Sequence, residues 1–321
     1  MTQPDTAILA KRLSAILPGP VAANENGVSY AGGAVPVIDG IVRFRQDSGY
    51  NVTFALQWNR FRTEQMDDVN GSEETMIRFR ETGWHIDWLA GKRVLEAGSG
   101  AGRFTRILCT TGAQLFTFDY STAVDANCQT NSGIGDVTFM QADIMNMPFA
   151  PGSFDYVFCH GVLQHTPDPK GAFMALTRML SPGGRISVDT YRKDGLIRPW
   201  KSKYIWRPIT TRVPPEKLLR FLEWFIPIWL PVDTTLNKVK HLANYLRSVI
   251  PCWNYWDRPL SDEQKLQWSI MDTFDALAPA YDIPATIDDV RRWFVEAGLT
   301  DIEVRPGGNG VIGNARRRSD G

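Results

Sequence analysis

Three glycines and two carboxylates are spaced as in a nucleotide-binding site. The segment VLEAGSGAGRF, residues 94–104, passes from an apolar run through Glu96 into a G-x-G-x-G loop and then into a helical pattern. Glycine lets the backbone turn sharply and approach a ligand, and the free N–H groups at a helix start attract an anion. Asp119 follows 21 residues after Gly98, where a carboxylate can accept the hydroxyl groups of a ribose. The spacing therefore predicts a ribose-containing ligand over the loop.

Dehydrogenases use a similar loop for NAD, but one residue argues against that use here. The third glycine of the dinucleotide fingerprint is replaced by Arg103. The chain also shows no evident Tyr–Lys pair or zinc set for hydride transfer. An NAD-dependent oxidoreductase is therefore the disfavoured alternative.

Alternating strand and helix patterns carry these residues. We expect strands at Arg93–Ala97, Gln114–Asp119, Val137–Gln141, Phe154–Cys159, Gly184–Tyr191, Asp301–Arg305 and Gly310–Ala315. A helix-length segment follows each of the first five, and Thr286 begins a helix that Gly298 ends, ahead of the last two strands. This alternation is typical of an α/β fold with a doubly wound sheet covered on both faces. Ligands of such sheets bind beyond the carboxyl ends of the strands, where the strand order reverses.

The rest of the chain predicts additions to this core. We expect a small β-rich segment of two or three strands over residues 1–46, a helical lead-in over 47–90, the core over 91–191 plus 284–321, and an α-helical insertion over 192–283. The insertion holds seven of the eleven Trp, and residues 192–220 contain nine Lys/Arg against two Asp/Glu. Such side chains suit sugar faces, phosphates or a membrane interface, or they pack aromatic rings on the sheet and leave basic stems in solvent. We expect the three additions to form a lid.

Later motifs extend the pattern beyond the glycine loop. These are QADIMNMPF (residues 141–149), SFDYVFCHGVLQH (153–165) and LSPGGRISV (180–188). In this order and spacing the chain resembles the class I S-adenosylmethionine-dependent methyltransferases over about residues 92–191 and 287–315. The resemblance implies a Rossmann-like sheet of seven strands, the last of them antiparallel, and S-adenosyl-L-methionine as cofactor.

The resemblance also implies which residues contact the cofactor. Glu96 and the glycine loop would surround its methionine end, Asp119 its ribose, and Asp143 its adenine amino group. The full expected set is Glu96, Gly98, Ser99, Gly100, Gly102, Asp119, Tyr120, Ala142, Asp143, Ile144, His160 and Gly161.

A second, more local resemblance lies ahead of the glycine loop. WNRF (residues 58–61), GSEE (71–74) and ETGW (81–84) are similar to segments of bacterial methyltransferases that act on small molecules or glycans, some of which carry a small zinc-ribbon-like module at the N-terminus. VPVIDGIVRF (35–44) resembles the end of that module without its cysteines, so we expect a metal-free version. We predict no metal site elsewhere, because the four cysteines form no C-x-x-C pair.

An activated methyl group requires mainly an aligned acceptor and exclusion of water. For a hydroxyl acceptor a base would help, and the candidates are His160 and His165. Either histidine could instead be structural. We predict that Trp58, Tyr191 and Trp200 contact the acceptor, which would be a sugar, a lipid-linked intermediate or a secondary metabolite. A module that binds the cofactor without catalysis is the other alternative.

Composition limits the partners. Lys+Arg and Asp+Glu number 35 each, so the chain lacks the basic excess typical of nucleic-acid binding. The N-terminus has no continuous apolar run of a signal peptide, and the most apolar later stretch is far shorter than the roughly 20 residues of a spanning helix. We therefore expect a cytoplasmic monomer or homodimer, with peripheral membrane contact through residues 192–230 as a further expectation.

Overall fold

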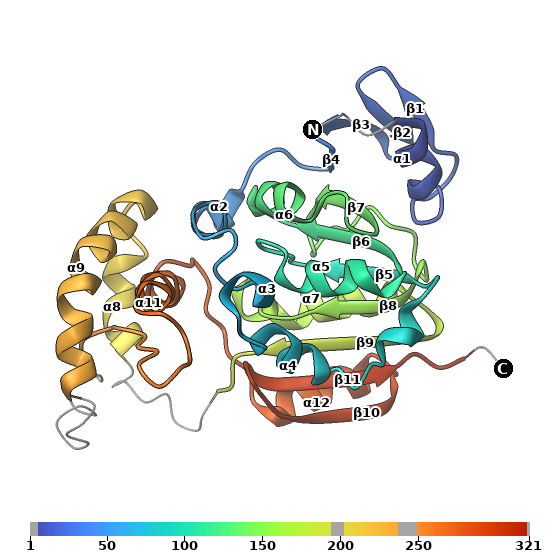
Figure 1. The fold of residues 1–321 in the computed structure, drawn as a ribbon. Coiled ribbons are helices and arrows are strands. Elements are labelled where there is room, and N and C mark those ends of the chain that lie inside the picture. The colour runs from blue at the N-terminus through green and yellow to red at the C-terminus, as the bar shows by residue number, and fades with distance from the viewer. Residues whose placement is uncertain (1–5, 194–201, 237–248, 320–321) are drawn as a thin grey trace.

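A single sheet organises the computed structural model, which describes residues 6–193, 202–236 and 249–319 (Figure 1). Its strands are β1 (Ala22–Asn24), β2 (Gly27–Tyr30), β3 (Gly33–Ile38), β4 (Ile41–Arg43), β5 (Arg93–Ala97), β6 (Gln114–Asp119), β7 (Asp136–Gln141), β8 (Phe154–Cys159), β9 (Leu180–Thr190), β10 (Thr300–Gly307) and β11 (Gly310–Arg316). Among the described residues their order is β1-β2-β3-β4-β7-β6-β5-β8-β9-β11-β10.

The seven strands from β7 to β10 confirm the expected core. β7, β6, β5, β8 and β9 are mutually parallel, and β11 lies antiparallel between β9 and β10. In register, Glu96 of β5 stands beside Thr117 of β6 and Phe158 of β8. The segments that follow these three strands therefore meet at the same edge of the sheet, where the strand order reverses.

The N-terminal segment corrects one expectation. It contains four strands rather than two or three, and β4 pairs in parallel with the edge strand β7, with Ile41 opposite Phe139. Ile41 and Val42 are buried at this junction. An edge strand presents unpaired backbone groups that another strand can satisfy. The segment therefore extends the sheet and does not form part of a lid. Its relation to a zinc ribbon stays a prediction.

Helices cover both faces of the sheet. They are α1 (Thr6–Leu13), α5 (Arg103–Leu108), α6 (Ala123–Asn131), α7 (Pro169–Arg178) and α12 (Ile287–Glu296), with short 3-10 turns η1 (Gly49–Asn51), η2 (Ile86–Leu89), η3 (Cys109–Thr111) and η4 (Leu163–His165). One apolar core contains side chains of α1, α7 and α12, with the rings of Phe173 and Phe294 4.6 Å apart. A second contains side chains of α5 and α6. Thr286 caps α12 as expected, since its hydroxyl accepts from the Asp289 N–H at 3.0 Å.

The lead-in and the insertion pack together. The lead-in forms α2 (Val52–Arg60), α3 (Asp67–Asn70) and α4 (Glu74–Arg80), and the insertion forms α8 (Ser202–Thr210), α9 (Pro215–Leu236) and α11 (Asp262–Leu277). A third core joins α9 and α11 to Phe61, and it buries Trp268 and Phe274. α11 lies between α9 and the sheet (Figure 1). The insertion thus buries these aromatic rings among helices and not on the sheet.

One face of α9 remains uncovered. Phe221, Trp224, Ile228 and Val232 follow helical spacing and are 50%, 63%, 58% and 44% exposed. We call these four residues the α9 stripe. Within the described ranges, no helix has both the length and the apolar character to cross a membrane.

Candidate active site

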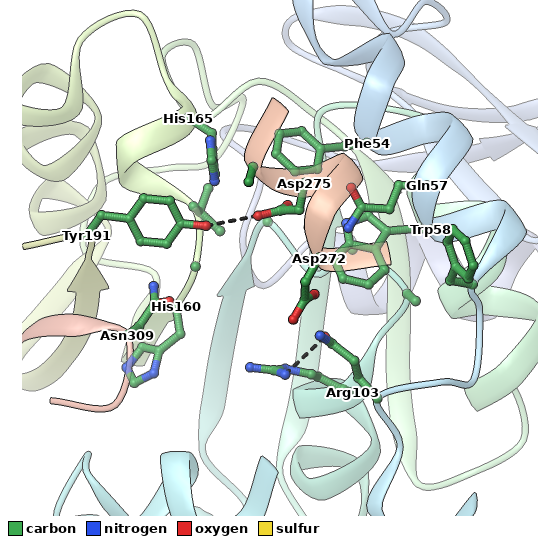
Figure 2. A pocket seen from close by; sticks show the side chains of 18 of the residues that line it. Phe54, Gln57, Trp58, Arg103, His160, His165, Tyr191, Asp272, Asp275 and Asn309 are labelled. Carbon is green, nitrogen blue, oxygen red and sulfur yellow. Dashed lines mark hydrogen bonds between the residues drawn. The ribbon is translucent and has the colours of Figure 1, made fainter. Parts of the chain in front are cut away.

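A cavity of about 1180 Å³ lies where the strand ends meet the lead-in and the insertion (Figure 2). Its lining comes from the glycine loop, the segments after β6 and β8, and helices α2 and α11. The volume exceeds that of a typical site for one small ligand, which is roughly 300–1,000 Å³. The cavity therefore has room for a donor and an acceptor.

The glycine loop forms one wall, and its glycines leave no room for a side chain. Gly98, Gly100 and Gly102 have φ values of 75°, 53° and 89°, in the left-handed region that favours glycine. A Cβ on Gly98 would lie 2.3 Å from Val162, and one on Gly100 3.0 Å from Trp58. The loop backbone can therefore lie directly against a ligand.

Asp119 ends β6 beside this loop. One carboxylate oxygen accepts from the Gly100 N–H at 3.0 Å, and the other accepts from the backbone and the hydroxyl of Ser121, both at 2.8 Å. Burial raises the pKa of Asp119, although these hydrogen bonds oppose the shift. The carboxylate lines the cavity at the position that the sequence predicts for ribose binding.

Aromatic rings continue the wall beyond Asp119. The ring of Tyr120 lies 4.5 Å from that of Tyr50, and the guanidinium of Arg45 lies 3.7 Å from the Tyr120 centroid. Ile144 lines the cavity with both tyrosines, and a planar base could pack on these rings. Arg45 comes from the N-terminal extension and contacts Tyr120 without lining the cavity itself, and Tyr50 lies in η1. The sequence patterns revealed neither of these two residues.

Asp143 stands back from the cavity. It accepts from the Met145 N–H at 2.8 Å and lies 3.7 Å from Arg45. Ala142 before it is buried. Neither is among the lining residues, so any contact of Asp143 with a base requires some movement.

Glu96 and Gly102 support the loop from beneath. The Glu96 carboxylate accepts from Thr105 at 2.5 Å and Thr117 at 2.7 Å, and the Gly102 carbonyl accepts from Asn131 at 2.9 Å. Burial raises the pKa of Glu96 to about 7, against the effect of the two threonine hydrogen bonds. Neither residue lines the cavity, so both hold the loop in place in this structure.

This donor half fits S-adenosylmethionine. The glycine cradle leaves space for a ligand, Asp119 offers carboxylate oxygens, and the rings of Tyr50 and Tyr120 offer flat apolar surface. The buried Ser99 hydroxyl lines the cavity and has no hydrogen-bond partner among the described residues. A bound ligand would supply the missing partner.

His160 follows β8 and lies deep in the cavity wall. Its Nε2 is 2.8 Å from the Ser187 hydroxyl, and its Nδ1 is 3.6 Å from an Asp189 oxygen. Burial lowers the pKa of His160 to about 4, although Asp189 favours the charged form. Asp189 also accepts from the Gly161 N–H at 2.5 Å and from Arg78 at 2.6 Å. His160 is therefore neutral and tied to this network.

His165 ends η4 and has a defined tautomer. Its Nδ1 is 3.0 Å from the Tyr281 carbonyl, which can only accept, so Nδ1 carries the proton and Nε2 the lone pair. The ring packs edge to face against Phe54 at 4.8 Å and Tyr191 at 5.3 Å. Burial lowers the pKa of His165, so the imidazole is neutral near pH 7 and can accept a proton.

The acceptor half contains polar residues that the sequence patterns did not single out. Helix α2 contributes Gln57 beside the expected Trp58, and α11 contributes Asp272 and Asp275 (Figure 2). The expected Tyr191 lines the cavity and donates its hydroxyl to Asp275 at 2.9 Å. The spacing of Trp268, Asp272 and Asp275 on one face of a helix is the signal that could have revealed them. Trp200 lies outside the described residues.

Comparison with known proteins relates the core of the chain to methyltransferases. Residues 95–188 match the family described as "Methyltransferase domain". The chain is 28% identical over 189 residues to O-methyltransferase rstn1 of Aspergillus nomiae. The aligned region covers 57% of this chain and 76% of that protein. It is 34% identical over 110 residues to a ubiquinone biosynthesis O-methyltransferase of Pseudomonas aeruginosa, covering 33% of this chain and 47% of that one. The match thus spans about half the length of the ubiquinone enzyme.

Among solved structures, the chain has a partial likeness to a phosphoethanolamine N-methyltransferase 2 of Haemonchus contortus in complex with S-adenosyl-L-methionine. The TM-score is 0.43 at 18% identity, covering 80% of this chain and 43% of that one.

The sheet, the glycine loop and the sequence match together define a class of enzyme that transfers methyl groups. Residues 95–188 form a class I S-adenosylmethionine-dependent methyltransferase domain, and its methyl donor is S-adenosyl-L-methionine.

Proposed function

We propose that this enzyme methylates a hydroxyl group of a small or carrier-linked acceptor, with His165 as the general base. The acceptor classes are a sugar, a lipid-linked intermediate and a secondary metabolite. The observation that carries the proposal is the fixed tautomer of His165 in the wall of the cavity. Two relatives whose names include O-methyltransferase support transfer to oxygen.

The donor half of the cavity would hold S-adenosylmethionine, which supplies an activated methyl group when bound. Asp119 accepts from its ribose hydroxyls, and Tyr50, Tyr120 and Ile144 pack on its base. The glycine loop and Ser99 contact its methionine end. Gly161 and His160, which contact Asp189, would also line the space that the donor occupies.

The acceptor half would align a hydroxyl and remove its proton. The methyl group would leave the donor sulfur, so that S-adenosylhomocysteine remains, and would bond to the acceptor oxygen. The hydroxyl proton would move to Nε2 of His165, and the Tyr281 carbonyl would stabilise the resulting cation by accepting from its Nδ1–H. Proton removal of this kind accelerates a reaction by roughly 10²–10⁴-fold. Phe54, Trp58 and the α11 helix exclude water from the same space.

His160 has a different role in this proposal. Its buried ring stacks on Phe158, with centroids 4.1 Å apart, and its Nε2 already meets Ser187. It therefore positions the turn around Gly161, while His165 exchanges the proton.

We also propose that the enzyme works in the cytoplasm at the inner face of the membrane, through the α9 stripe. Three exposed basic residues, Arg212, Lys217 and Arg220, come just before the stripe in the sequence. Exposed aromatic rings beside basic side chains suit a helix that lies in a lipid interface. A carrier-linked acceptor would be presented at such a surface.

Two measurements test the proposed function, one of donor binding and one of methyl transfer. Calorimetric titration of the purified protein should give micromolar binding of S-adenosylmethionine and S-adenosylhomocysteine but not of NAD. Radiolabelled donor is then supplied with matched hydroxyl, amine and carbon acceptors, and we expect label on oxygen alone. Binding of NAD without the adenosyl ligands, or label on nitrogen or carbon alone, would refute the proposal. Donor binding without transfer to any acceptor would favour a non-catalytic module.

The His165→Asn variant tests the base. We expect kcat to fall about 10²-fold or more while the affinity for S-adenosylhomocysteine stays unchanged. In the wild-type enzyme kcat/KM should fall as the pH drops through the His165 pKa, which lies below the usual value of about 6.5, because protonated Nε2 cannot accept a proton. The variant should lose this acidic limb. The matched control is His85→Asn, an exposed histidine outside the cavity, which should retain wild-type kinetics. An unchanged pH profile in His165→Asn would exclude it as the base.

A further inference from the structure

Gln57 is the most unusual polar residue of the cavity. It is 1% exposed, lines the cavity, and neither its amide oxygen nor its amide nitrogen has a hydrogen-bond partner among the described residues. A buried amide without hydrogen-bond partners destabilises the folded protein. Buried groups of this kind are normally hydrogen-bonded, so the amide points to a ligand that both donates and accepts.

Two carboxylates stand on the same side of the cavity. Asp272 and Asp275 project from α11 toward the space that the Gln57 amide faces (Figure 2). Tyr255 donates its hydroxyl to one oxygen of Asp272, and Tyr191 does the same for Asp275. The second oxygen of each carboxylate accepts no hydrogen bond within the part of the chain that the structure describes. Burial raises the pKa of Asp272 to about 7, so donors at this free oxygen would stabilise its charge.

A guanidinium completes the polar set. Arg103 lines the cavity, donates to the Gln65 side chain at 3.0 Å, and lies 4.7 Å from the Phe104 centroid. Among the described residues it has no carboxylate within ion-pair distance, whereas the neighbouring Arg78 pairs with Asp189. Burial lowers the pKa of Arg103 to about 9. An oxygen-rich ligand would supply acceptors to its remaining N–H groups.

The combination restricts the acceptor. An aromatic diol could satisfy one or two of these groups and would leave the others unpaired. A phosphate would suit Arg103 but would meet two carboxylates, and a cation would suit the carboxylates but would meet Arg103. Vicinal hydroxyls donate to carboxylates and accept from a guanidinium, and an amide does both. The rings of Trp58 and Tyr255 add flat surfaces for the C–H face of a saturated ring.

We propose that Gln57, Asp272 and Arg103 form a sugar-recognition site, which binds vicinal hydroxyls of the acceptor and directs another hydroxyl toward His165. The inference rests on the proposed function for the methylated atom, but recognition of the sugar stands on these three side chains. The shared chemistry is a pyranose ring, whether free, nucleotide-linked or lipid-linked.

Saturation-transfer NMR on the full chain, saturated with S-adenosylhomocysteine, tests recognition without turnover. The probes are methyl glycosides of glucose, galactose, mannose and rhamnose, with UDP-glucose and octyl glucoside as the nucleotide- and lipid-linked arms, and catechol as the aromatic comparison. We expect at least one pyranose to bind, and the arm with the highest affinity identifies the carrier. Failure of every sugar arm would overturn the inference.

Two variants locate the site. Gln57→Met keeps the volume and removes the amide, and Asp272→Asn keeps the shape and removes the charge. Each should weaken sugar binding about tenfold or more while the affinity for S-adenosylhomocysteine and the unfolding temperature stay near wild type. The matched control is Gln267→Met, a glutamine on α11 that does not line the cavity and should bind the sugar normally. Unchanged sugar affinity in both cavity variants would overturn the inference.

The outcomes separate this inference from the proposed function. Methylation of catechol oxygen with no sugar binding would retain the function and refute the sugar site. Sugar binding that depends on Gln57 with transfer to nitrogen alone would retain the site and refute the function.

Discussion

The acidic residues near the glycine loop differ in whether they can contact a ligand, support the loop, or do both. Asp119 does both, because one oxygen fixes the Gly100 N–H while the carboxylate also lines the cavity. Glu96 stands one strand away and serves the loop alone through Thr105 and Thr117. Two acids of one sequence motif therefore have different chemistry, since only one of them reaches the cavity.

The Asp119→Ala variant tests this distinction. We expect the affinity for S-adenosylmethionine to fall at least tenfold, because the ribose loses a carboxylate that accepts its hydroxyls. Circular dichroism should show the wild-type fold. Asp87→Ala, at an exposed position outside the cavity, is the control and should bind normally. Calorimetry that gives equal affinities for Asp119→Ala and wild type would remove the ribose assignment.

At the scale of elements, separate segments contribute separate halves of the site. The sheet edge supplies the donor half, and α2 with α11 supplies the acceptor half. α11 begins at a capping box in which the Ser261 hydroxyl accepts from the Gln264 N–H. α12 begins in the same way at Thr286, but it packs on the sheet in the core that it shares with α7, and none of its residues lines the cavity. We therefore expect α11 to contribute to ligand binding and α12 to contribute to the stability of the fold.

Thr286→Ala should lower the free energy of unfolding by about 1 kcal/mol without changing turnover, because it removes the N-cap of α12. Urea titration measures the loss. Hydrogen bonds donated by Thr286 lower the pKa of Asp289, so this stabilisation is present above the unfolded pKa of about 3.8 and is lost as the pH falls through the lower folded value. The difference from wild type should therefore shrink in acid. Thr110→Ala, at an exposed threonine that caps no helix, is the control. A loss of turnover with unchanged stability would contradict this assignment.

At the scale of the whole molecule, helix α9 lies at one margin and α1 lies at the opposite end (Figure 1). The cavity lies between them, on the inner side of α11. A membrane that bound the α9 stripe would therefore not need to contact the sheet or the N-terminal extension.

Anionic liposomes test the membrane proposal. The wild-type chain should co-sediment with phosphatidylglycerol vesicles at low salt and less at high salt, because the basic residues beside the α9 stripe are screened. A double variant, Trp224→Ser with Ile228→Ser, should lose most of the bound fraction. Ile8→Ser, at a residue 54% exposed on α1, is the matched control and should still sediment. No co-sedimentation of wild type at low salt would refute the proposal, and a stripe-dependent dimer in light scattering would assign the stripe to a second copy instead.

The sequence by itself determined the features that depend on residues close together in the chain, namely the strands, the glycine loop and the helix cap. The strands β5, β6 and β8 have the predicted bounds, and the glycine loop, Asp119 and the Thr286 cap lie where their patterns place them. Burial on both faces of parallel strands gives continuous apolar runs, and glycine at a tight turn leaves a signature within a few residues.

Only the tertiary structure decided which distant segments meet. It paired β4 with β7, brought Gln57 of α2 and Asp272 of α11 to one cavity, and placed Asp143 beside Arg45, outside the cavity lining. It also fixed the His165 tautomer through the carbonyl of Tyr281, 116 positions away. Sequence patterns could not predict these contacts, because a polar residue on a helix face gives the same pattern whether that face contacts solvent or a ligand. The packing between elements that are distant in the sequence decides which of the two it contacts.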